Sequence, residues 1–335
     1  MLGHLLLVAA SVGAAAAEYD SLAVRVECSP RELQLCDVVF VRISMENTGR
    51  KAIVVPSRFP RELGFCRFEL IDPKERTRFD FLVDGMACGG VPNTILAPGK
   101  TLVILYDFLP VPRFDRIGCR FWDPEKWRRD SYELRAYLRL GKRIYREVFG
   151  PEIRIAGRAE HEIAALRKLY GGGRQRKPPR DWDWDQPTLG LFGLSTFPLD
   201  TSTAENLAAL QRTLSPGSLQ DLVRVTQLTQ AVYKVHEMRQ RRAAAARLVA
   251  WLDDRPEIER HWIAMRLYNW CWHNRRLGVF AYEFVDHVIC RLPEQYGGNQ
   301  DYQQSMRTEY LLDHAEAQKY WKKATTARSV SDHGS

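Results

Sequence analysis

Between residues 22 and 155, hydrophobic positions recur with the two-residue period of β-strands. Leu22, Val24 and Val26 alternate with polar residues, and the run from Asp37 to Met45 is dense in apolar and β-branched side chains. Further strand-like runs, separated by Pro- or Gly-containing turns, cover Ala52–Val55, Cys66–Ile71, Thr101–Phe108, Tyr132–Leu140 and Arg143–Val148. Many short strands with turns between them predict an all-β sandwich.

From Arg158 onward, the hydrophobic period becomes helical. A helix is predicted over Glu160–Tyr170, ending at a run of three glycines, and the sequence from Ser202 to Glu205 reads as a capping box that opens the next helix. The later helices are predicted at Leu222–Val235, Arg239–Leu252, Glu257–Asn274, Val279–Arg291 and Asn299–Thr326. Short breaks between helices favour a bundle or stacked helical hairpins. The fold class is therefore multidomain, all-β followed by all-α.

These patterns divide the chain into five segments. Gly171–Gly173 and Pro178-Pro179 interrupt both helix and strand, which predicts an exposed connector between the two halves. The predicted segments are a signal peptide (1–17), a β domain (18–157), a helix with the connector (158–200), a helical domain (201–327) and a disordered tail (328–335).

The N-terminal segment has the order of a secretory signal. An apolar run at Leu5–Ala10 precedes the small residues Ala15–Ala17, and the chain turns polar at Glu18. The run is too short to cross a bilayer, and no later stretch reaches that length. We therefore expect cleavage after Ala17, a mature chain without a transmembrane segment, and a periplasmic or secreted location.

Three segments of the β half carry a resemblance. They are DVVFVRISMENTGRKAIVV from Asp37, LAPGKTLVILYDF from Leu96 and SYELRAYLRL from Ser131. Their order, a strand ending in an Asn-x-Gly turn, a Pro-Gly turn into a long strand and a late Tyr-x-Leu-x-Ala strand, resembles the Ig-like domains of exported bacterial proteins. The resemblance implies an Ig-like β-sandwich over about residues 22–155, and such folds serve many functions.

Charge and composition add little to the choice of partner. The chain has a formal charge of +8, with 38 arginines and 11 lysines. Arginine pairs well with phosphates and carboxylates, so an acidic partner is one interpretation. The arginines are spread along the whole chain, which favours solvated faces instead. Binding to nucleic acid conflicts with export and is not expected.

Seven cysteines remain in the exported chain. In an oxidising compartment, disulfides are expected among the early group. The sequence leaves their pairing open and leaves one cysteine of the five over. The candidates are Cys28, Cys36, Cys66, Cys88 and Cys119.

The segment from Asp181 to Asp185 alternates three aspartates with two tryptophans. Asp181, Asp183 and Asp185 resemble the start of a calcium loop, but the turning glycine and the bidentate acid of such a loop are missing. The other interpretation has the tryptophans docked on the helical domain and the aspartates facing solvent, where Arg176, Lys177 and Arg180 would partner them. Docking is favoured, and calcium stays the alternative.

Local catalytic motifs are absent from the chain. The sequence contains no HExxH, no G-x-S-x-G, no Ser-x-x-Lys and no phosphate-binding glycine loop. No cofactor is expected, and enzymatic activity is not favoured. Triads assembled from distant residues remain open, so an envelope hydrolase with a site at the domain junction is the competing hypothesis.

The sequence therefore predicts an exported, non-enzymatic binding or scaffold protein of the bacterial envelope. Its partner would be another envelope or secreted protein, with a glycan or a small ligand as alternatives. Aromatic and basic side chains in the connector are the types that dominate interfaces. The predicted binding residues are Trp182, Trp184, Arg176, Lys177 and Arg180.

Overall fold

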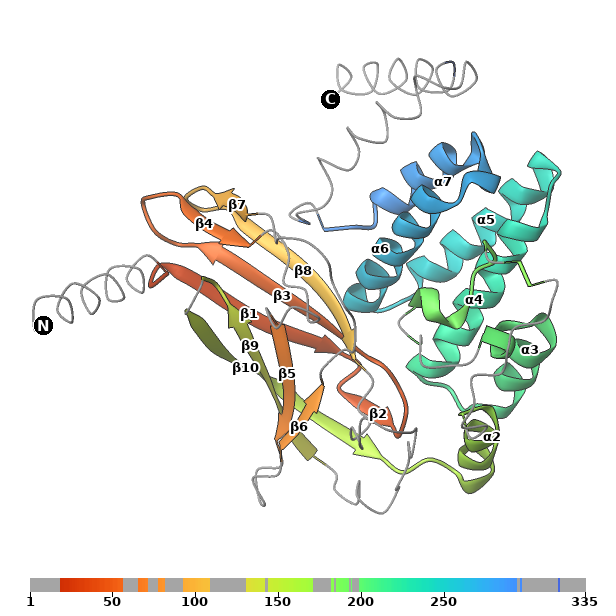
Figure 1. Cartoon of the computed structure of the whole chain (residues 1–335), viewed down its shortest axis with the longest axis horizontal. Helices are drawn as coiled ribbons and strands as arrows, with labels where there is room; N and C mark the ends of the chain where they lie inside the picture. The colour runs from red at the N-terminus through yellow and green to blue at the C-terminus, as the bar shows by residue number, and fades with distance from the viewer. Residues whose placement is uncertain are drawn as a thin grey trace, which may run out of the picture.

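The structure is a computed structural model of the chain, with a strand region followed by a helical region (Figure 1). It describes residues 19–56, 66–71, 78–81, 93–108, 131–141, 144–170, 182–183, 185–192, 194, 199–293, 296 and 319. The signal segment, residues 109–130, most of the predicted last helix and the tail lie outside this part of the chain. The expected combination of a strand-rich and a helix-rich half is confirmed.

The strand region contains two main sheets and a two-stranded ribbon. The strand orders are β1-β3-β8, β2-β10-β9-β5-β6 and β4-β7. All pairs are antiparallel except β2 with β10. The strands are β1 (Leu22–Ser29), β2 (Glu32–Gln34), β3 (Val39–Asn47), β4 (Ile53–Pro56), β5 (Cys66–Ile71), β6 (Arg78–Phe81), β7 (Asn93–Leu96), β8 (Thr101–Phe108), β9 (Ser131–Arg139) and β10 (Tyr145–Ala156).

Apolar side chains join the two main sheets. Phe68 of β5 and Tyr106 of β8 lie edge to face with ring centroids 5.4 Å apart. The turn into β8 has the expected chemistry: Gly99 adopts φ +69°, and the Lys100 N–H donates to the Ala97 carbonyl. This is the position of a type II turn that requires positive φ, and proline precedes it.

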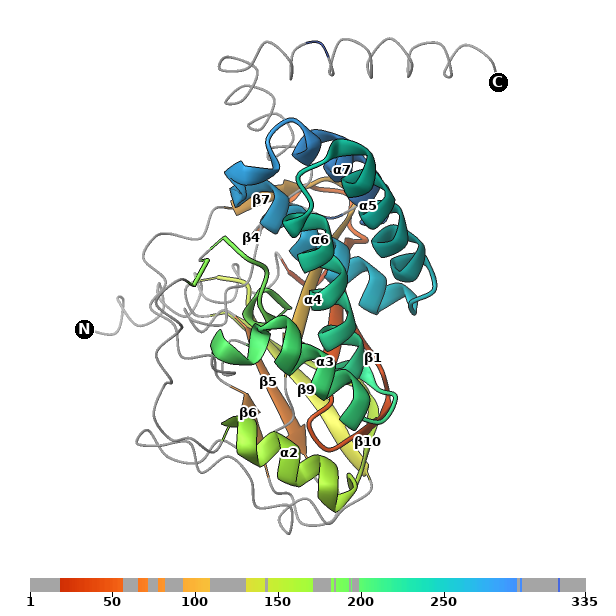
Figure 2. The ribbon, with the colours of Figure 1, turned by 90° about the vertical axis from the view of Figure 1, so that its right-hand side faces the viewer.

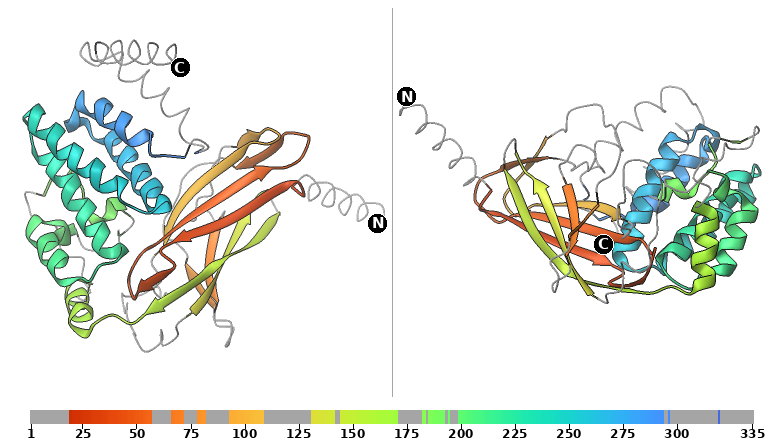
Figure 3. Two further views of the ribbon diagram at one scale, coloured as in Figure 1. Left: turned by 180° about the vertical axis from the view of Figure 1, so that it is seen from behind. Right: turned by 60° about the horizontal axis from the view of Figure 1, so that its bottom comes forward.

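Strand β10 continues past the predicted end at Val148. A register shift against β9 between Phe149 and Glu152 accommodates Gly150-Pro151. Such a bulge lets a strand pass a proline that would otherwise break the ladder. The continuation carries β10 to β2 and then directly into the first helix, so it places the helical region beside the β2–β3 turn (Figure 3).

The helices follow the predicted boundaries within a few residues. They are α2 (Glu160–Tyr170), α3 (Ala204–Thr213), α4 (Ser218–Lys234), α5 (Met238–Asp253), α6 (Glu257–His273) and α7 (Phe280–Ile289), with 3-10 turns η3 (Leu189–Phe192), η4 (Leu199–Ser202) and η5 (Arg275–Leu277). The cap of α3 differs from the predicted box. Thr203 is the N-cap and accepts from the Asn206 N–H, whereas the Ser202 hydroxyl accepts from the Leu189 N–H.

Helix α6 packs on the strand region (Figure 2). Trp262 is fully buried, and its ring centroid lies 5.0 Å from that of Phe40 on β3. Buried residues of the strands and of the helices belong to one connected apolar cluster. The two regions therefore share a core. Across the described ranges, every helix falls short of the length and apolarity that a bilayer crossing requires.

Candidate functional site

A buried ionic network fastens the strand region to the helical region. Arg158, in the segment between β10 and α2, donates to Asp37 Oδ1 and to Glu162 Oε2, both at 2.9 Å. Its Nε–H donates to the Leu35 carbonyl at 2.6 Å. The side chains of all three charged residues are at most 2% exposed. The Arg158 guanidinium thus joins the β2–β3 turn to α2 and to the short segment between β10 and α2.

The first turn of α4 docks on the same aspartate. The Leu219 N–H donates to Asp37 Oδ1 at 3.1 Å, and the Ser218 hydroxyl donates to the Val38 carbonyl at 2.7 Å. Negative charge at a helix N-terminus is stabilised by the unpaired N–H groups there. A Cβ on Gly217 would lie 2.6 Å from Asp37 Oδ2, so this approach requires a residue without a side chain.

The Asp37 carboxylate also organises its own turn. It accepts from the Gln34 N–H at 2.9 Å, and the Asp37 N–H donates to the Gln34 carbonyl. Cys36, the third residue of this turn, adopts φ +78°, a region that residues other than glycine rarely occupy. Burial raises the pKa of Asp37, against the attraction of Arg158 and the two backbone N–H groups. The junction therefore contains a carboxylate that depends on its partners for charge compensation.

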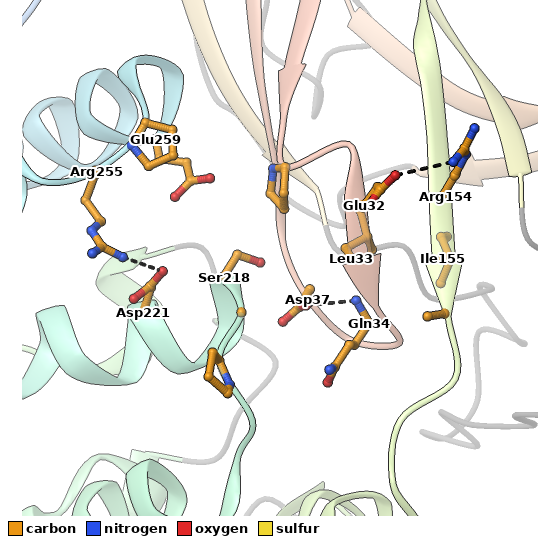
Figure 4. A pocket seen from close by; sticks show the side chains of 15 residues that line it. Glu32, Leu33, Gln34, Asp37, Arg154, Ile155, Ser218, Asp221, Arg255 and Glu259 are labelled. Carbon is orange, nitrogen blue, oxygen red and sulfur yellow. Dashed lines mark hydrogen bonds and ion pairs between the residues drawn. The ribbon is translucent and has the colours of Figure 1, made fainter.

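A pocket of about 630 Å³ opens beside this network (Figure 4). Both regions line it: the strand side supplies β2, the β2–β3 turn and the end of β10, and the helical side supplies the starts of α4 and α6. The lining residues are Pro30, Glu32, Leu33, Gln34, Asp37, Arg154, Ile155, Ala156, Pro216, Gly217, Ser218, Asp221, Arg255, Pro256 and Glu259.

Two carboxyl groups on the helical side of the pocket carry unusual electrostatics. Burial, together with the charges of Asp221 and Asp37, raises the pKa of Glu259 to about 7, against the Ser29 hydroxyl and the charge of Arg255. Burial likewise raises the pKa of Asp221, against the nearby Arg255. A carboxyl group that titrates near neutral pH in a cleft is a candidate functional group.

The contacts of these two groups differ. Asp221 Oδ2 pairs with Arg255 Nη1 at 2.8 Å. Glu259 is 5% exposed, accepts one hydrogen bond at Oε1 from the Ser29 hydroxyl at 2.9 Å, and makes no ion pair within the described ranges. In Figure 4 its carboxylate points into the space above Asp221 and Ser218. Glu259 is thus a buried acid whose charge is uncompensated by a direct basic neighbour.

The predicted connector site is described only in part. Trp182 is half-buried, whereas Trp184, Arg176, Lys177 and Arg180 lie outside the described residues. The structure therefore does not bring the predicted binding residues together within its described ranges. The five residues remain a prediction.

Of the three aspartates considered for calcium, two contact the helical region. Asp183 Oδ2 accepts from the Tyr233 hydroxyl and from Arg276 Nη1, both at 2.7 Å, and Asp185 Oδ2 lies 3.1 Å from Arg276 Nε. Asp181 lies outside the described residues. In the described residues the aspartates themselves contact the helical region, with Arg276 as the basic partner, whereas the docking interpretation had the tryptophans docked and the aspartates facing solvent beside the connector basic residues.

The hydroxyl of Tyr233 provides a test of this docking. The pKa of Tyr233 is raised to about 12, first by burial and then by Asp183. We expect Tyr233→Phe to lower the free energy of unfolding by about 1 kcal/mol, because a buried hydrogen bond to a carboxylate is lost while Arg276 stays. Urea unfolding measures it. Tyr145→Phe, at an exposed position on β10, is the matched control, and equal losses in both variants would contradict the docking role.

Three of the early cysteines lie within the described residues. Cys28, Cys36 and Cys66 are buried in β1, the β2–β3 turn and β5, and they are not bonded to one another. These three cysteines are therefore free in the structure, each thiol being buried, and disulfides within the full group of five stay a prediction. Burial raises the pKa of Cys28 to about 12, which suppresses its thiolate. Cys88 and Cys119 lie outside the described residues.

Comparison with known proteins does not identify a family. No family model matches the chain, and no curated protein matches it. Similar solved structures include a β-glucosidase from Erythrobacter marinus (15% identity, TM-score 0.24, 41% of this chain and 15% of that one). Others are the sporulation control protein Spo0M from Bacillus subtilis (12%, 0.25, 44% and 56%) and the alkylpurine DNA glycosylase AlkC from Pseudomonas fluorescens (10%, 0.23, 40% and 30%).

The chain thus spans between 15% and 56% of the length of these three structures. Likenesses at this TM-score carry no argument about fold or activity. The interpretation of the junction pocket therefore depends on its own residues.

Proposed function

We propose that the protein is an exported binding protein of the bacterial envelope, and that its ligand is a small molecule held in the junction pocket. The carrying observation is the pocket itself, lined from both regions and containing a buried acid with an unpartnered oxygen. Clefts at domain interfaces with a few polar groups on apolar walls are the usual form of small-ligand sites.

The architecture supports a rigid site. The ionic network around Arg158 and the contact of Trp262 with Phe40 fix the two walls of the pocket relative to each other. A preformed site loses less freedom on binding than a flexible one, so small ligands bind it more tightly. We further propose that the strand region is an Ig-like β-sandwich and that residues 1–17 direct export.

A second candidate function uses the same pocket. Glu259, with a pKa of about 7, has the proton affinity of a general acid or base at neutral pH, and it lies near the acid Asp221. An envelope hydrolase at the domain junction would use such a pair. In that case a ligand bound in the pocket is converted, whereas the binding function predicts that it is recovered unchanged.

The protein partner predicted from the connector is a separate proposal. Trp182, Trp184 and the connector basic residues would contact an envelope or secreted protein. Among the described residues, the pocket and the connector have none in common, so separate substitutions test the two proposals.

Filling the pocket tests the small-ligand function. Ala156 is exposed and lines the pocket, so Ala156→Trp occupies the space without disturbing the core. Thermal unfolding is measured with a panel of millimolar probes: aliphatic amines, aliphatic carboxylates, monosaccharides and divalent cations. We expect at least one class to raise the Tm of the wild type by about 3 °C or more, since a ligand well above its Kd stabilises the folded state.

The same shift is expected in Ala246→Trp, a matched control on the exposed face of α5, and is expected to vanish in Ala156→Trp. A shift that persists in Ala156→Trp, or no shift with any class, would contradict a ligand site at the junction. Mass spectrometry of the probe after incubation distinguishes binding from hydrolysis.

A further inference from the structure

The charges around the pocket leave one acid without a direct counter-ion. The other acids at the pocket form ion pairs with arginines. The pairs are Asp37 with Arg158, Asp221 with Arg255, and Glu32 with Arg154, the last at 3.4 Å. Glu259 has only the Ser29 hydroxyl as a hydrogen-bond donor within the described ranges. An ionised carboxylate that is 95% buried requires compensation by a cation or by donors. Among the described residues, Glu259 is therefore the pocket acid without a direct basic partner, and a cation bound there would compensate its ionised form.

The shape of the pocket restricts what can supply this charge. Among the described residues, no group of three or more His, Cys, Asp or Glu side chains is placed to hold a metal ion. The pocket also has apolar lining residues: Leu33 and Ile155, which are register partners on β2 and β10 on the strand side, and Pro256 on the helical side. A charged head on an aliphatic chain matches this combination better than a bare ion.

We propose that the junction pocket binds an aliphatic primary amine, with its ammonium group between Glu259 and Asp221 and its alkyl chain along Leu33 and Ile155. This inference depends on the proposed small-ligand function and specifies the ligand class of that site. An ammonium group has three N–H donors, enough for the unpartnered oxygen of Glu259 and for the carboxylate of Asp221. Charge-assisted hydrogen bonds of this type are among the strong ones.

Binding is expected to depend on pH. Asp221, Asp37 and Arg255 are the charged groups that act on Glu259. The Glu259 pKa near 7 leaves this carboxyl mostly protonated at pH 5.5 and ionised at pH 8.5, while an alkylammonium stays protonated throughout. The affinity for an amine should therefore rise with pH across this range.

The probe is n-butylamine, titrated into the full-length protein by calorimetry at pH 5.5 and pH 8.5, with n-butanol and butyrate as isosteric controls. We expect the affinity for n-butylamine to be at least about tenfold higher at pH 8.5 than at pH 5.5, with no comparable binding of either control. In Glu259→Gln the affinity at pH 8.5 should fall about tenfold or more and lose its pH dependence.

A matched control separates this site from general surface charge. Glu160→Gln removes an exposed acid at the start of α2 that does not line the pocket and should change the affinity by less than about twofold. Equal affinity of n-butylamine for the wild type and Glu259→Gln, or no binding at all, would overturn the proposal. Binding of Ca²⁺ or Mg²⁺ in place of the amine would overturn it in favour of a metal site.

Failure of this inference differs from failure of the proposed function. If n-butylamine fails while another probe class gives a Tm shift that Ala156→Trp abolishes, the pocket is a ligand site of different chemistry. If neither occurs, the small-ligand function fails as well.

Discussion

Replacing Arg158 with methionine should lower the free energy of unfolding by about 3–5 kcal/mol at pH 7. The guanidinium is fully buried and is the cationic partner of both Asp37 and Glu162. Removing one member of a buried ionic network leaves the other charges uncompensated in a low-dielectric interior. Methionine keeps much of the side-chain volume. The loss of stability would therefore come mainly from the missing charge and hydrogen bonds, and less from a cavity. Urea denaturation followed by circular dichroism measures it.

Two further variants test whether the loss of stability comes from the buried ionic network. Arg154→Met removes an arginine of β10 whose side chain is 64% exposed, and should cost less than about 1 kcal/mol. Adding Asp37→Asn and Glu162→Gln to Arg158→Met should recover part of the lost free energy of unfolding, because the two uncompensated carboxylate charges are removed. Equal losses in Arg158→Met and Arg154→Met would mean that the buried network does not hold the two regions together.

Glu259→Gln should stabilise the protein at pH 8 by about 3 kcal/mol and leave it nearly unchanged at pH 4.5. The folded-state pKa is about 7 against an unfolded value of 4.5. The folded state therefore keeps a proton that the unfolded state has released. The contribution of this group to stability is fully present below pH 4.5 and is lost as the pH rises to 7, by about 1.4 kcal/mol per pH unit. Glutamine removes the titration and can still accept from Ser29.

The neighbouring acid on the same helix provides the opposite control. Glu257 is paired with Arg42 Nη1 at 2.8 Å, which lowers the pKa of Glu257. Its contribution is present above its unfolded pKa and is lost in acid, so Glu257→Gln should be neutral in acid and mildly destabilising at pH 8. Asp221 and Asp37 keep their own pH dependence in both variants. A Glu259→Gln variant with the wild-type pH profile would show that Glu259 is ionised and compensated at neutral pH.

Much of the fold follows from periodicity in the sequence. The strands β1, β3, β5, β8 and β9 and all the described helices coincide with predicted segments, because each buries one face and ends at proline, glycine or a capping residue. The exceptions have local physical causes. Strands β2, β6 and β7 were not predicted, because three or four residues are too few to show a period, and the second half of β10 was missed because it follows Pro151 through a bulge.

The candidate site could not be predicted in the same way. Asp37 lies at the start of a strand-like run, and Arg255 and Pro256 belong to a stretch that signals only a helix break. Each residue is ordinary in its own segment, and the pocket exists because β2, α4 and α6 meet in space. The one part that sequence reasoning anticipated was the location, since a hydrolase site at the domain junction was among the hypotheses.

Sequence composition instead directed attention to the connector, where tryptophans and arginines are concentrated. In the described part of that segment, Asp183 and Asp185 serve as anchors to Tyr233 and Arg276. The unusual composition of this segment thus coincides with a contact between the connector and the helical region. Glu259 lies in the first turn of an aromatic helix, where an acid is ordinary in sequence. It is the stronger candidate for a functional residue because it is buried among residues from distant parts of the chain.

The most direct test of the central claim, a small-ligand site between the two regions, compares ligand-induced Tm shifts in the wild type and Ala156→Trp under identical probe concentrations. The account predicts a shift of about 3 °C or more in the wild type, the same shift in Ala246→Trp, and none in Ala156→Trp. An equal shift in all three proteins, or none in any of them, would contradict it.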